Sequence, residues 1–219
     1  MTSREFRDRL TRRARRAKLA VAPDVAQAFE AYFTLLDRWN AKINLTALSL
    51  RPPDDEAFDR LLIEPLSAAR YVPDESDVWI DLGSGGGSPA IPLKVVRSKL
   101  RLTMVESKVR KAAFLREAVR TLNLADAAVE NVRIEVLAAT PAWRGSASVV
   151  TVRAVKADPT LFAHAAELLE SNGRLLLFRP TNTPIGAKSF EHMETVQLTD
   201  TPRAFLAILR RVFHVEQRR

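Results

Sequence analysis

The sequence predicts a Rossmann-like α/β fold, in which a mostly parallel sheet is covered by helices on both faces. Short apolar runs alternate with helical patterns from about residue 77 onward. Such runs are typical of strands buried on both faces, and their alternation with helices favours parallel pairing. Four of the chain's seven glycines lie within five residues, directly after the first run. Residues 1–70 have helical patterns only, so we expect an N-terminal helical region (1–70) and a Rossmann-like core (71–219).

The helical region should contain three segments. Residues 4–20 are rich in arginine with sparse apolar positions, so this segment either forms an exposed amphipathic helix or stays mobile. Residues 25–40 predict a helix with one buried face, because apolar side chains recur at steps of three and four. These side chains are Phe29, Phe33, Leu36 and Trp39. A third helix should run from Asp54 or Asp55 to about Ala69, with a kink at Pro65, which has no N–H to donate.

The core should contain five strands in its parallel part. They are expected at residues 77–82, 102–105, 127–129, 149–152 and 175–178, with two further candidates at 195–198 and 205–212. Helices are expected between them at residues 89–97, 108–122 and 159–169.

The net charge of +8 is concentrated at the two ends of the chain. Residues 1–20 hold eight Arg or Lys and two acids, and residues 203–219 hold five Arg and one acid. A near-neutral body with basic ends is typical of proteins that bind polyanions, so we expect RNA or DNA as a partner. Solvated termini in an arginine-rich chain are the alternative interpretation.

Two classes of site are not expected from the composition. The chain has no cysteine, and its histidines, His164, His192 and His214, lack the spacing of metal ligands, so we expect no metal. We also find neither a long apolar stretch nor the apolar core of a signal peptide, so we expect a cytoplasmic protein without a membrane partner.

The glycine cluster is the strongest local signal in the chain. Gly83, Gly85, Gly86 and Gly87 follow Asp81 at the end of a strand and lead into a helix at Pro89. Glycines allow positive φ angles and a close approach of the backbone to a ligand, and the free N–H groups of the next helix favour an electron-rich partner. A flexible linker is the alternative, but the apolar runs on both sides argue against it.

Two cofactors compete for this loop. Residues 85–90 fit the G-x-G-x-x-[GA] pattern of dinucleotide sites, which would indicate NAD. The order Asp-x-Gly-x-Gly-x-Gly from Asp81 instead resembles the first motif of Rossmann-like methyltransferases. Glu106, at the end of the next strand, can accept hydrogen bonds from ribose hydroxyls in either case; a plain surface acid is the alternative.

Three segments together resemble one family more closely. Residues 39–46 (WNAKINLT) look like W-N-x-x-x-N-L-T, and residues 81–93 (DLGSGGGSPAIPL) look like D-x-G-[ST]-G-x-G-x-P-G-I-P-L. Residues 106–115 resemble an acid-Ser pair followed by a basic helix that contains F-L. This is the pattern of the RsmG (GidB) family, bacterial methyltransferases of a guanine N7 in small-subunit (16S) ribosomal RNA. Weaker similarities at residues 131–135 and 153–155 extend the resemblance to roughly residues 30–178.

The chain departs from the family pattern at four places. Ser88 replaces an apolar residue and Ala90 replaces a glycine. Residues 60–66 (RLLIEPL) stand where the family has R-H-x-x-D-S-L, which places Glu64 at the acidic position. Phe178-Arg179-Pro180 replaces L-K-G after the fifth strand.

The resemblance implies S-adenosyl-L-methionine as the cofactor and a set of site residues. Those expected to bind the cofactor are Asp81, Gly83, Ser84, Gly85, Gly87, Glu106, Ser107 and Arg133. Arg153 should act at the target base or its phosphate, because ligands gather at the carboxyl edge of open α/β sheets; a structural ion pair is the alternative. Asn40, Asn44 and Arg179 are candidates for substrate contacts, although Asn40, Asn44 and Thr46 would also suit backbone capping.

The partner implied is ribosomal RNA of the small subunit or its assembly intermediate, bound by a monomer. Guanine N7 has a lone pair and no proton, so the reaction needs no general base, in agreement with a sequence that offers no evident one. Three alternatives stay open: a methyltransferase with another substrate, an NAD-dependent oxidoreductase, and a non-catalytic RNA-binding relic of the fold.

Overall fold

A computed structural model describes residues 1–72, 78–200 and 203–212 of the chain, and its centre is a seven-stranded sheet. The strands are β1 (Val78–Leu82), β2 (Arg101–Val105), β3 (Ala127–Glu130), β4 (Ala147–Arg153), β5 (Leu169–Arg179), β6 (Phe190–Asp200) and β7 (Arg203–Arg211). Their order is β3-β2-β1-β4-β5-β7-β6. The first five strands pair in parallel, and β7 is antiparallel to both β5 and β6. The expected mostly parallel sheet is confirmed, and both candidate C-terminal strands form.

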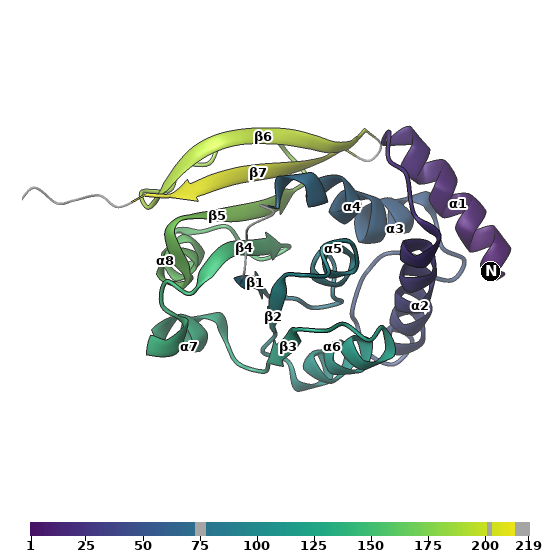
Figure 1. The fold of residues 1–219 in the computed structure, drawn as a ribbon, viewed down its shortest axis with the longest axis horizontal. Helices are drawn as coiled ribbons and strands as arrows, with labels where there is room; N and C mark the ends of the chain where they lie inside the picture. The colour runs from purple at the N-terminus through teal and green to yellow at the C-terminus, as the bar shows by residue number, and fades with distance from the viewer. Residues whose placement is uncertain (73–77, 201–202, 213–219) are drawn as a thin grey trace, which may run out of the picture.

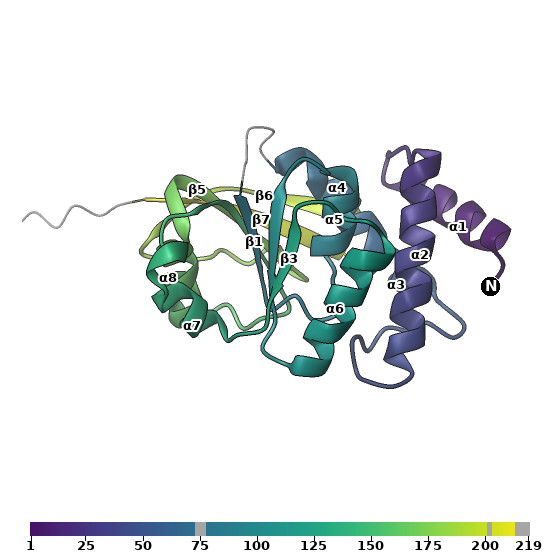
Figure 2. The ribbon, with the colours of Figure 1, turned by 60° about the horizontal axis from the view of Figure 1, so that its bottom comes forward.

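Helices cover both faces of this sheet, as expected (Figures 1 and 2). On one side lie α7 (Ile134–Ala139) and α8 (Pro159–Leu168); on the other lie α5 (Ala90–Val96) and α6 (Val109–Thr121), with the N-terminal helices beyond them. The chain runs from β1 outward to β3 and then returns to place β4 beside β1. Ligands of open α/β sheets bind at such a reversal, at the carboxyl ends of the strands.

Two core elements differ from the expectation. Helix α7 and a short 3₁₀ turn, η3 (Pro141–Trp143), follow β3 without having been expected, because both are brief. Strand β5 begins at Leu169 rather than at residue 175, and its pairing with β4 shifts register between Ala147 and Val149. Asn172 takes a φ of 65° in this irregular stretch. The first residues of β5 therefore form a bulged strand, which their polar sequence did not predict. The first residue of the expected strand 77–82 lies outside the described residues.

The arginine-rich N-terminus forms an ordered helix, α1 (Ser3–Arg16), which resolves the two alternatives for residues 4–20. Thr2 and Glu5 form a capping box at its start. Its apolar face contributes Phe6 to a cluster of three rings with Phe33 and Phe58, whose centroids are 5.1–5.6 Å apart. Phe33 belongs to the expected second helix, α2 (Pro23–Asn40).

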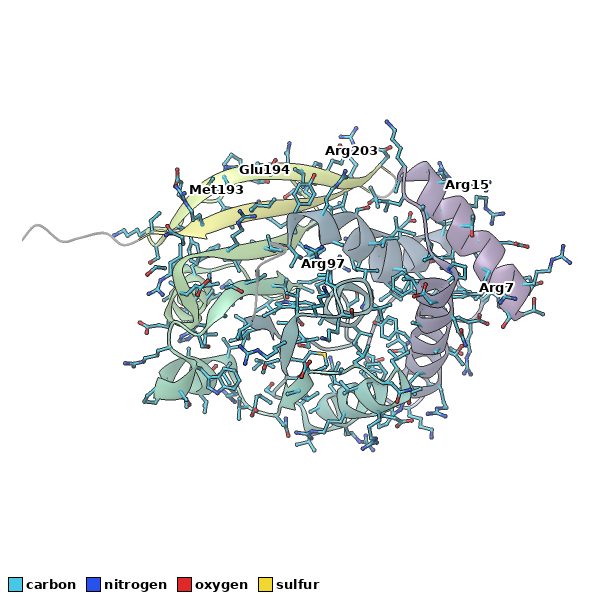
Figure 3. All side chains as sticks on the ribbon, in the orientation of Figure 1. Arg7, Arg15, Arg97, Met193, Glu194 and Arg203 are labelled. Carbon is cyan, nitrogen blue, oxygen red and sulfur yellow. The ribbon has the colours of Figure 1, made fainter. Side chains whose placement is uncertain are left out.

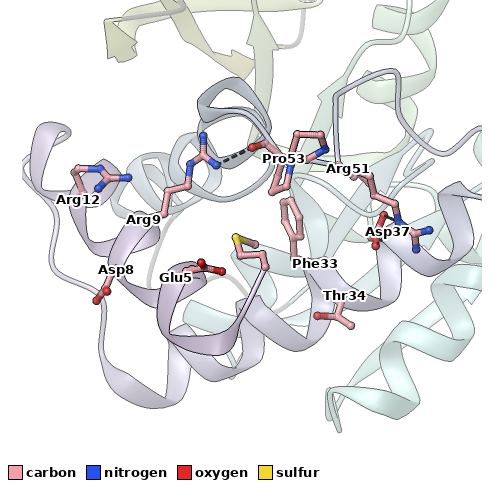
Figure 4. Close-up of a pocket in the computed structure, with 12 residues that line it drawn as sticks. Glu5, Asp8, Arg9, Arg12, Phe33, Thr34, Asp37, Arg51 and Pro53 are labelled. Carbon is pink, nitrogen blue, oxygen red and sulfur yellow. Dashed lines mark hydrogen bonds and ion pairs between the residues drawn. The ribbon is translucent and has the colours of Figure 1, made fainter.

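Ion pairs fix α1 as much as apolar contacts do. Arg13 Nε donates to Asp59 Oδ1 at 2.8 Å, and both side chains are buried. Arg9 pairs with Asp55 at 2.7 Å and donates to the Pro53 carbonyl at 2.7 Å, the contact drawn in Figure 4. Two arginines of the basic N-terminus therefore point inward and hold the helix in place.

The third N-terminal helix contains a π-helical turn instead of a simple kink. It comprises α3 (Asp55–Phe58), η1 (Asp59–Ile63), α4 (Glu64–Ala68) and the 3₁₀ turn η2 (Ala69–Tyr71). Pro65 would be the donor to the Leu61 carbonyl in an α-helix and to the Arg60 carbonyl in a π-helix, but it has no N–H. The Glu64 N–H donates to Asp59. The carbonyls of Arg60 and Leu61 are thereby left for other partners, and both find them in the site described below.

The helical region and the core share one hydrophobic cluster. Buried side chains of α1 and α2 belong to the same cluster as Trp79, Leu102 and Leu176 of the sheet. A second cluster lies on the opposite face, beneath α7 and α8. The N-terminal helices are therefore packed against the face of the sheet that they adjoin, which positions them to shape a site at its edge.

Replacing the buried acid beside α1 should cost much stability. In Asp59→Asn the buried Arg13 guanidinium loses the charge of the buried carboxylate that it pairs with, while its pair with the half-exposed Asp55 remains. We expect the free energy of unfolding to fall by about 3 kcal/mol in urea titrations. The control is Asp8→Asn, which breaks an exposed pair with Arg4 at 3.8 Å and should change stability by at most about 0.5 kcal/mol. Equal effects of the two substitutions would contradict this account of α1.

Candidate active site

The glycine loop between β1 and α5 lies at the reversal of strand order and is tied to β2. The N–H groups of Gly83 and Ser84 donate to the Val105 carbonyl at 2.9 and 3.0 Å. Gly83 and Gly87 have φ angles of +73° and +85°, which strain any other residue. A Cβ at Gly83 would also lie 2.6 Å from Val155 Cγ2. At these two positions the backbone therefore requires glycine.

Two adjoining cavities open beside this loop. The larger, of about 610 Å³, lies between the loop, residues 45–48, the α3–η1 segment and the ends of β4 and β5. The smaller, of about 430 Å³, lies between residues 105–108 and residues 132–135. Gly83 and Glu106 line both. The arrangement can accept a ligand with two parts that meet beside the Glu106 carboxylate.

Glu106 is held firmly at this junction, at the carboxyl end of β2. Its Oε2 accepts the Gly85 N–H at 3.0 Å, and its Oε1 accepts the Lys108 N–H at 2.7 Å. Asn131 Nδ2 donates to its carbonyl at 2.8 Å. Each carboxylate oxygen has a second lone pair, so Glu106 retains the capacity to accept hydroxyl groups. Glu106 therefore lies at the end of β2 with free acceptor capacity toward the two cavities, and its role toward a ribose stays a prediction.

Asp81 lies beneath the glycine loop and lines neither cavity. Its carboxylate accepts the Thr151 hydroxyl at 2.5 Å, and Trp79 Nε1 donates to the same hydroxyl oxygen at 2.8 Å. Ser84 Oγ donates to the Asp81 carbonyl at 3.1 Å. Burial raises the pKa of Asp81 to about 6, against the opposing effect of hydrogen bonds from Ser84 and Thr151. The negative charge therefore acts on the loop from below.

Arg153 lies at the carboxyl end of β4, lines the larger cavity and is also in an ion pair. Its Nη2 donates to Glu64 Oε2 at 2.6 Å, and its Nη1 donates to Ser88 Oγ at 3.1 Å. Its Cζ lies 4.5 Å from the centroid of the Phe178 ring. Burial raises the pKa of Glu64 and lowers that of Arg153. The two interpretations of Arg153, site residue and structural ion pair, are compatible in this geometry.

The π-turn supplies the remaining contacts of this cluster. Its two freed carbonyls accept hydrogen bonds from the site: the Arg60 carbonyl from Arg153 Nη1, and the Leu61 carbonyl from Ser88 Oγ at 3.1 Å. Three departures from the family pattern, Glu64, Ser88 and Phe178, thus meet around one guanidinium. They form one local network on the floor of the cavity.

The substrate candidates occupy different surroundings. Asn40 Oδ1 accepts the N–H groups of Leu45 and Thr46 at 2.9 and 3.0 Å, so it shapes the loop that lines the larger cavity. Asn44 is exposed and is not part of the cavity lining. Arg179 lines the larger cavity and donates to the Thr183 carbonyl.

Two cofactor candidates line the smaller cavity. Ser107 is exposed there, and Arg133 is exposed and pairs with Glu135 at 3.3 Å. Together with Glu106 they place polar groups on both walls of this cavity.

Tyr32 was not expected to belong to the site. From α2 its hydroxyl donates to the Gly86 carbonyl at 2.6 Å, and burial raises its pKa. A Cβ at Gly86 would lie 3.1 Å from the Leu45 carbonyl oxygen, so the N-terminal region presses on the loop here. The only sequence signal was a tyrosine on the buried face of a helix, which predicts burial but not its partner.

Two kinds of feature are missing from the part of the chain that the structure describes. No group of three or more His, Asp or Glu side chains could hold a metal ion. Among the helices in residues 1–72, 78–200 and 203–212, none has the length and apolar character needed to cross a bilayer.

Comparison with solved structures identifies the fold. The O-methyltransferase from Bacillus cereus in complex with SAH matches with a TM-score of 0.58 at 14% identity, over 83% of this chain and 90% of that chain. A SAM-dependent methyltransferase from Aquifex aeolicus matches with a TM-score of 0.55 at 13% identity, over 74% and 96%. These likenesses, at 13–14% identity, show that the chain has a Rossmann-like fold of the kind seen in these two methyltransferases.

Comparison of sequences identifies the family. The model described as rRNA small subunit methyltransferase G matches residues 25–202. The ribosomal RNA small subunit methyltransferase G of Roseiflexus sp. (strain RS-1) is 36% identical over 170 residues, 77% of this chain and 71% of that protein. The protein of the same name from Xanthomonas axonopodis pv. citri is 37% identical over 177 residues, 73% and 79% of the two chains. The chain therefore belongs to the rRNA small subunit methyltransferase G family.

The raised pKa of Asp81 predicts a pH-dependent stability. Between its ordinary pKa of 3.8 and about 6 the folded chain holds a proton that the unfolded chain has released, so stability falls as pH rises through this window. Asn can still accept the Thr151 hydroxyl but carries no charge. Asp81→Asn should therefore be more stable than the parent chain by about 1–3 kcal/mol at pH 7.5 and nearly equal to it at pH 4. Urea unfolding at the two pH values checks this, and a parallel offset at both would contradict it.

Proposed function

We propose that this protein transfers a methyl group from S-adenosylmethionine to N7 of a guanine in small-subunit ribosomal RNA. The observation that carries the proposal is Glu106, which stands between two cavities that share the glycine loop, in a chain of this family. Such a site can hold a cofactor whose adenosine lies in the smaller cavity and whose reactive group faces the larger one, with the Glu106 carboxylate between them. The relatives are named ribosomal RNA small subunit methyltransferase G, which supports the RNA substrate.

The residues around the smaller cavity would hold the adenosine end of the cofactor. Glu106 accepts the ribose hydroxyls, while Ser107 and Arg133 border the adenine. The methionine end follows the loop at Gly83, Ser84, Gly85 and Gly87, with the charge of Asp81 beneath it. The bound cofactor supplies an electrophilic sulfonium methyl, and the anionic charge of Asp81 and Glu106 favours its positive charge.

The chain's own contribution to methyl transfer is orientation and electrostatics. Guanine N7 attacks with a lone pair and releases no proton, so no side chain has to act as a base. Holding the two reactants in line can supply roughly 7–11 kcal/mol of the barrier in favourable cases. Arg153, held by Glu64 and stacked on Phe178, orients the target base or its phosphate. Asn40, Asn44 and Arg179 are the candidate substrate contacts: Arg179 lines the larger cavity, Asn40 shapes the loop at residues 45–48 that lines it, and Asn44 is exposed next to that loop.

The outward-facing basic side chains would contact RNA phosphates. Arg9 and Arg13 are engaged in ion pairs, whereas Arg7 and Arg15 on α1 and Arg203 on β7 are exposed (Figure 3). Binding through such contacts weakens steeply with salt. Arg218 and Arg219, also expected to contribute, lie outside the described residues. We propose that the protein acts as a monomer in the cytoplasm, on the small subunit or its assembly intermediate.

The direct test uses small ribosomal subunits from cells that lack the protein. Purified protein and a donor with a labelled methyl group should label the ribosomal RNA of these particles, and mapping should place the label at N7 of one guanine. Deproteinised RNA, tested in parallel, distinguishes a particle substrate from naked RNA. Labelling of protein, of DNA or of a different RNA atom would overturn the proposed substrate. Donor binding without any transfer would favour the RNA-binding relic.

Removing the carboxylate at the junction should weaken cofactor binding. Glu106→Ala leaves ribose hydroxyls without an acceptor, so we expect a loss of about 1–3 kcal/mol in the binding of S-adenosylhomocysteine, measured by calorimetry. Glu170→Ala removes an exposed acid from the start of β5 and should leave the affinity unchanged. Unchanged affinity in Glu106→Ala would contradict the assignment.

Arg153→Lys tests the role of the guanidinium. Lysine keeps the positive charge but cannot reproduce the fork that reaches both Glu64 and Ser88 or the planar contact with Phe178. We expect kcat to fall by about tenfold to hundredfold while the affinity for S-adenosylhomocysteine stays the same. A loss in cofactor affinity with an unchanged kcat would assign Arg153 to the cofactor site instead.

A further inference from the structure

Carboxylates are the strongest hydrogen-bond acceptors that the larger cavity can offer to a base. Among the described residues that line it, two carry carboxylates, Glu56 and Glu106. Glu106 lies at the junction with the smaller cavity, where the proposed function assigns its remaining acceptor capacity to the ribose hydroxyls of the cofactor. Glu56 is therefore the carboxylate that is left for a group bound in the larger cavity.

Glu56 belongs to a different wall from the glycine loop. It lies in α3, and its side chain is 48% exposed. Its nearest ionic partner in the structure is Arg60 Nε at 3.6 Å, which is beyond hydrogen-bond distance. Both oxygens thus keep acceptor capacity.

A row of side chains with alternating charges connects Glu56 to Arg153. Arg60 Nε lies 3.6 Å from Glu56 Oε1 and 3.7 Å from Glu64 Oε1, and Glu64 in turn holds Arg153. The π-turn anchors the middle of this row, because the Arg60 carbonyl accepts from Arg153. Glu56 and Arg153, which both line the larger cavity, are therefore parts of one network of charged side chains.

Methylation at N7 leaves the Watson–Crick edge of the guanine free to contact the protein. A guanine that presents N7 to the donor turns its Watson–Crick edge to another side of the cavity. That edge carries two adjacent donors, the N1–H and the 2-amino group, whereas adenine has an acceptor at N1. Two carboxylate oxygens complement two adjacent donors, and unstacked RNA bases are commonly read by hydrogen bonds to this edge.

The geometry points to Glu56 as the residue that determines guanine specificity, by accepting hydrogen bonds from N1–H and the 2-amino group of the target base. This inference rests on the proposed function, since it assumes a guanine methylated at N7. The alternative role of Glu56 is structural: an acid in the first turn of a helix stabilises the positive end of its dipole. The two roles differ in what they predict for the choice of base.

The test compares guanine with inosine, which keeps N7 and N1–H and lacks the 2-amino group. Two otherwise identical RNAs are assembled by ligation, with guanine or inosine at the mapped target position. Each is supplied in the form, naked or reconstituted into small-subunit particles, in which the natural RNA accepts the methyl group, and kcat/KM is measured on each. The parent chain should prefer guanine by about tenfold to hundredfold, the range for one hydrogen bond to a charged group. Glu56→Ala should lose this preference, through a fall in kcat/KM on the guanine RNA. Glu56→Gln keeps one acceptor oxygen, so its preference for guanine over inosine should lie between that of the parent chain and that of Glu56→Ala.

Controls separate this inference from the proposed function. Glu194→Gln removes an exposed acid from β6 and should keep the preference of the parent chain. Calorimetry with S-adenosylhomocysteine should give equal affinities for the parent chain, Glu56→Gln and Glu56→Ala. If the parent chain methylates guanine and inosine equally, or if both Glu56 variants keep its preference, Glu56 does not read the base and the proposed function stands. If the parent chain methylates neither RNA, the proposed function itself fails.

Discussion

The whole site depends on how tightly the glycine loop is held. The loop is hydrogen-bonded to the Val105 carbonyl of β2, to Tyr32 of α2 and to the carboxylate of Glu106. This course of the backbone needs positive φ angles at Gly83 and Gly87, where a Cβ would also collide with Val155 and Ile91, which is why glycine is required at both positions. A loop restrained from several sides keeps its backbone in one place, so a ligand does not have to order it on binding. The N-terminal helices are therefore part of the site as well as a cover for the sheet.

Two acids near this loop, Asp81 and Glu64, are buried, and burial opposes their ionisation. Asp81 has a pKa raised to about 6 beneath the loop, and Glu64 has a raised pKa beside Arg153. Burying each of these acids lowers the free energy of unfolding. Asp81 lies beneath the loop proposed to hold the cofactor, and Glu64 pairs with Arg153, which is proposed to contact the substrate. Acids with pKa values shifted by burial are concentrated at functional sites in proteins. Apolar packing offsets this loss of stability, in the ring cluster around Phe33 and in the hydrophobic clusters on both faces of the sheet.

Much of this organisation could be predicted from the sequence, because the signals are local. Apolar runs predicted the strands, the glycine cluster predicted the loop, and the place of Glu106 after the second strand predicted its position at the carboxyl edge. What could not be predicted depends on pairs far apart in the chain. Tyr32 meets Gly86, Thr151 meets Asp81, and Ser88 meets Leu61 only after folding. The bulge in β5 was concealed for another reason: its polar residues have no strand-like alternation.

The π-turn at Asp59–Ile63 has a consequence for how this chain can change in evolution. Such a turn holds one more residue than the α-helical turn that it replaces. Deleting one residue there would restore α-helical geometry and keep α3 and α4 in nearly the same relative orientation, because the wide turn absorbs the extra residue without rotating its flanks. The deletion would instead disturb the two carbonyls, of Arg60 and Leu61, that accept hydrogen bonds from Arg153 and Ser88. The extra residue of the π-turn is therefore tied to the cluster around Arg153, and Glu56 and Asp59 do not depend on it for their places.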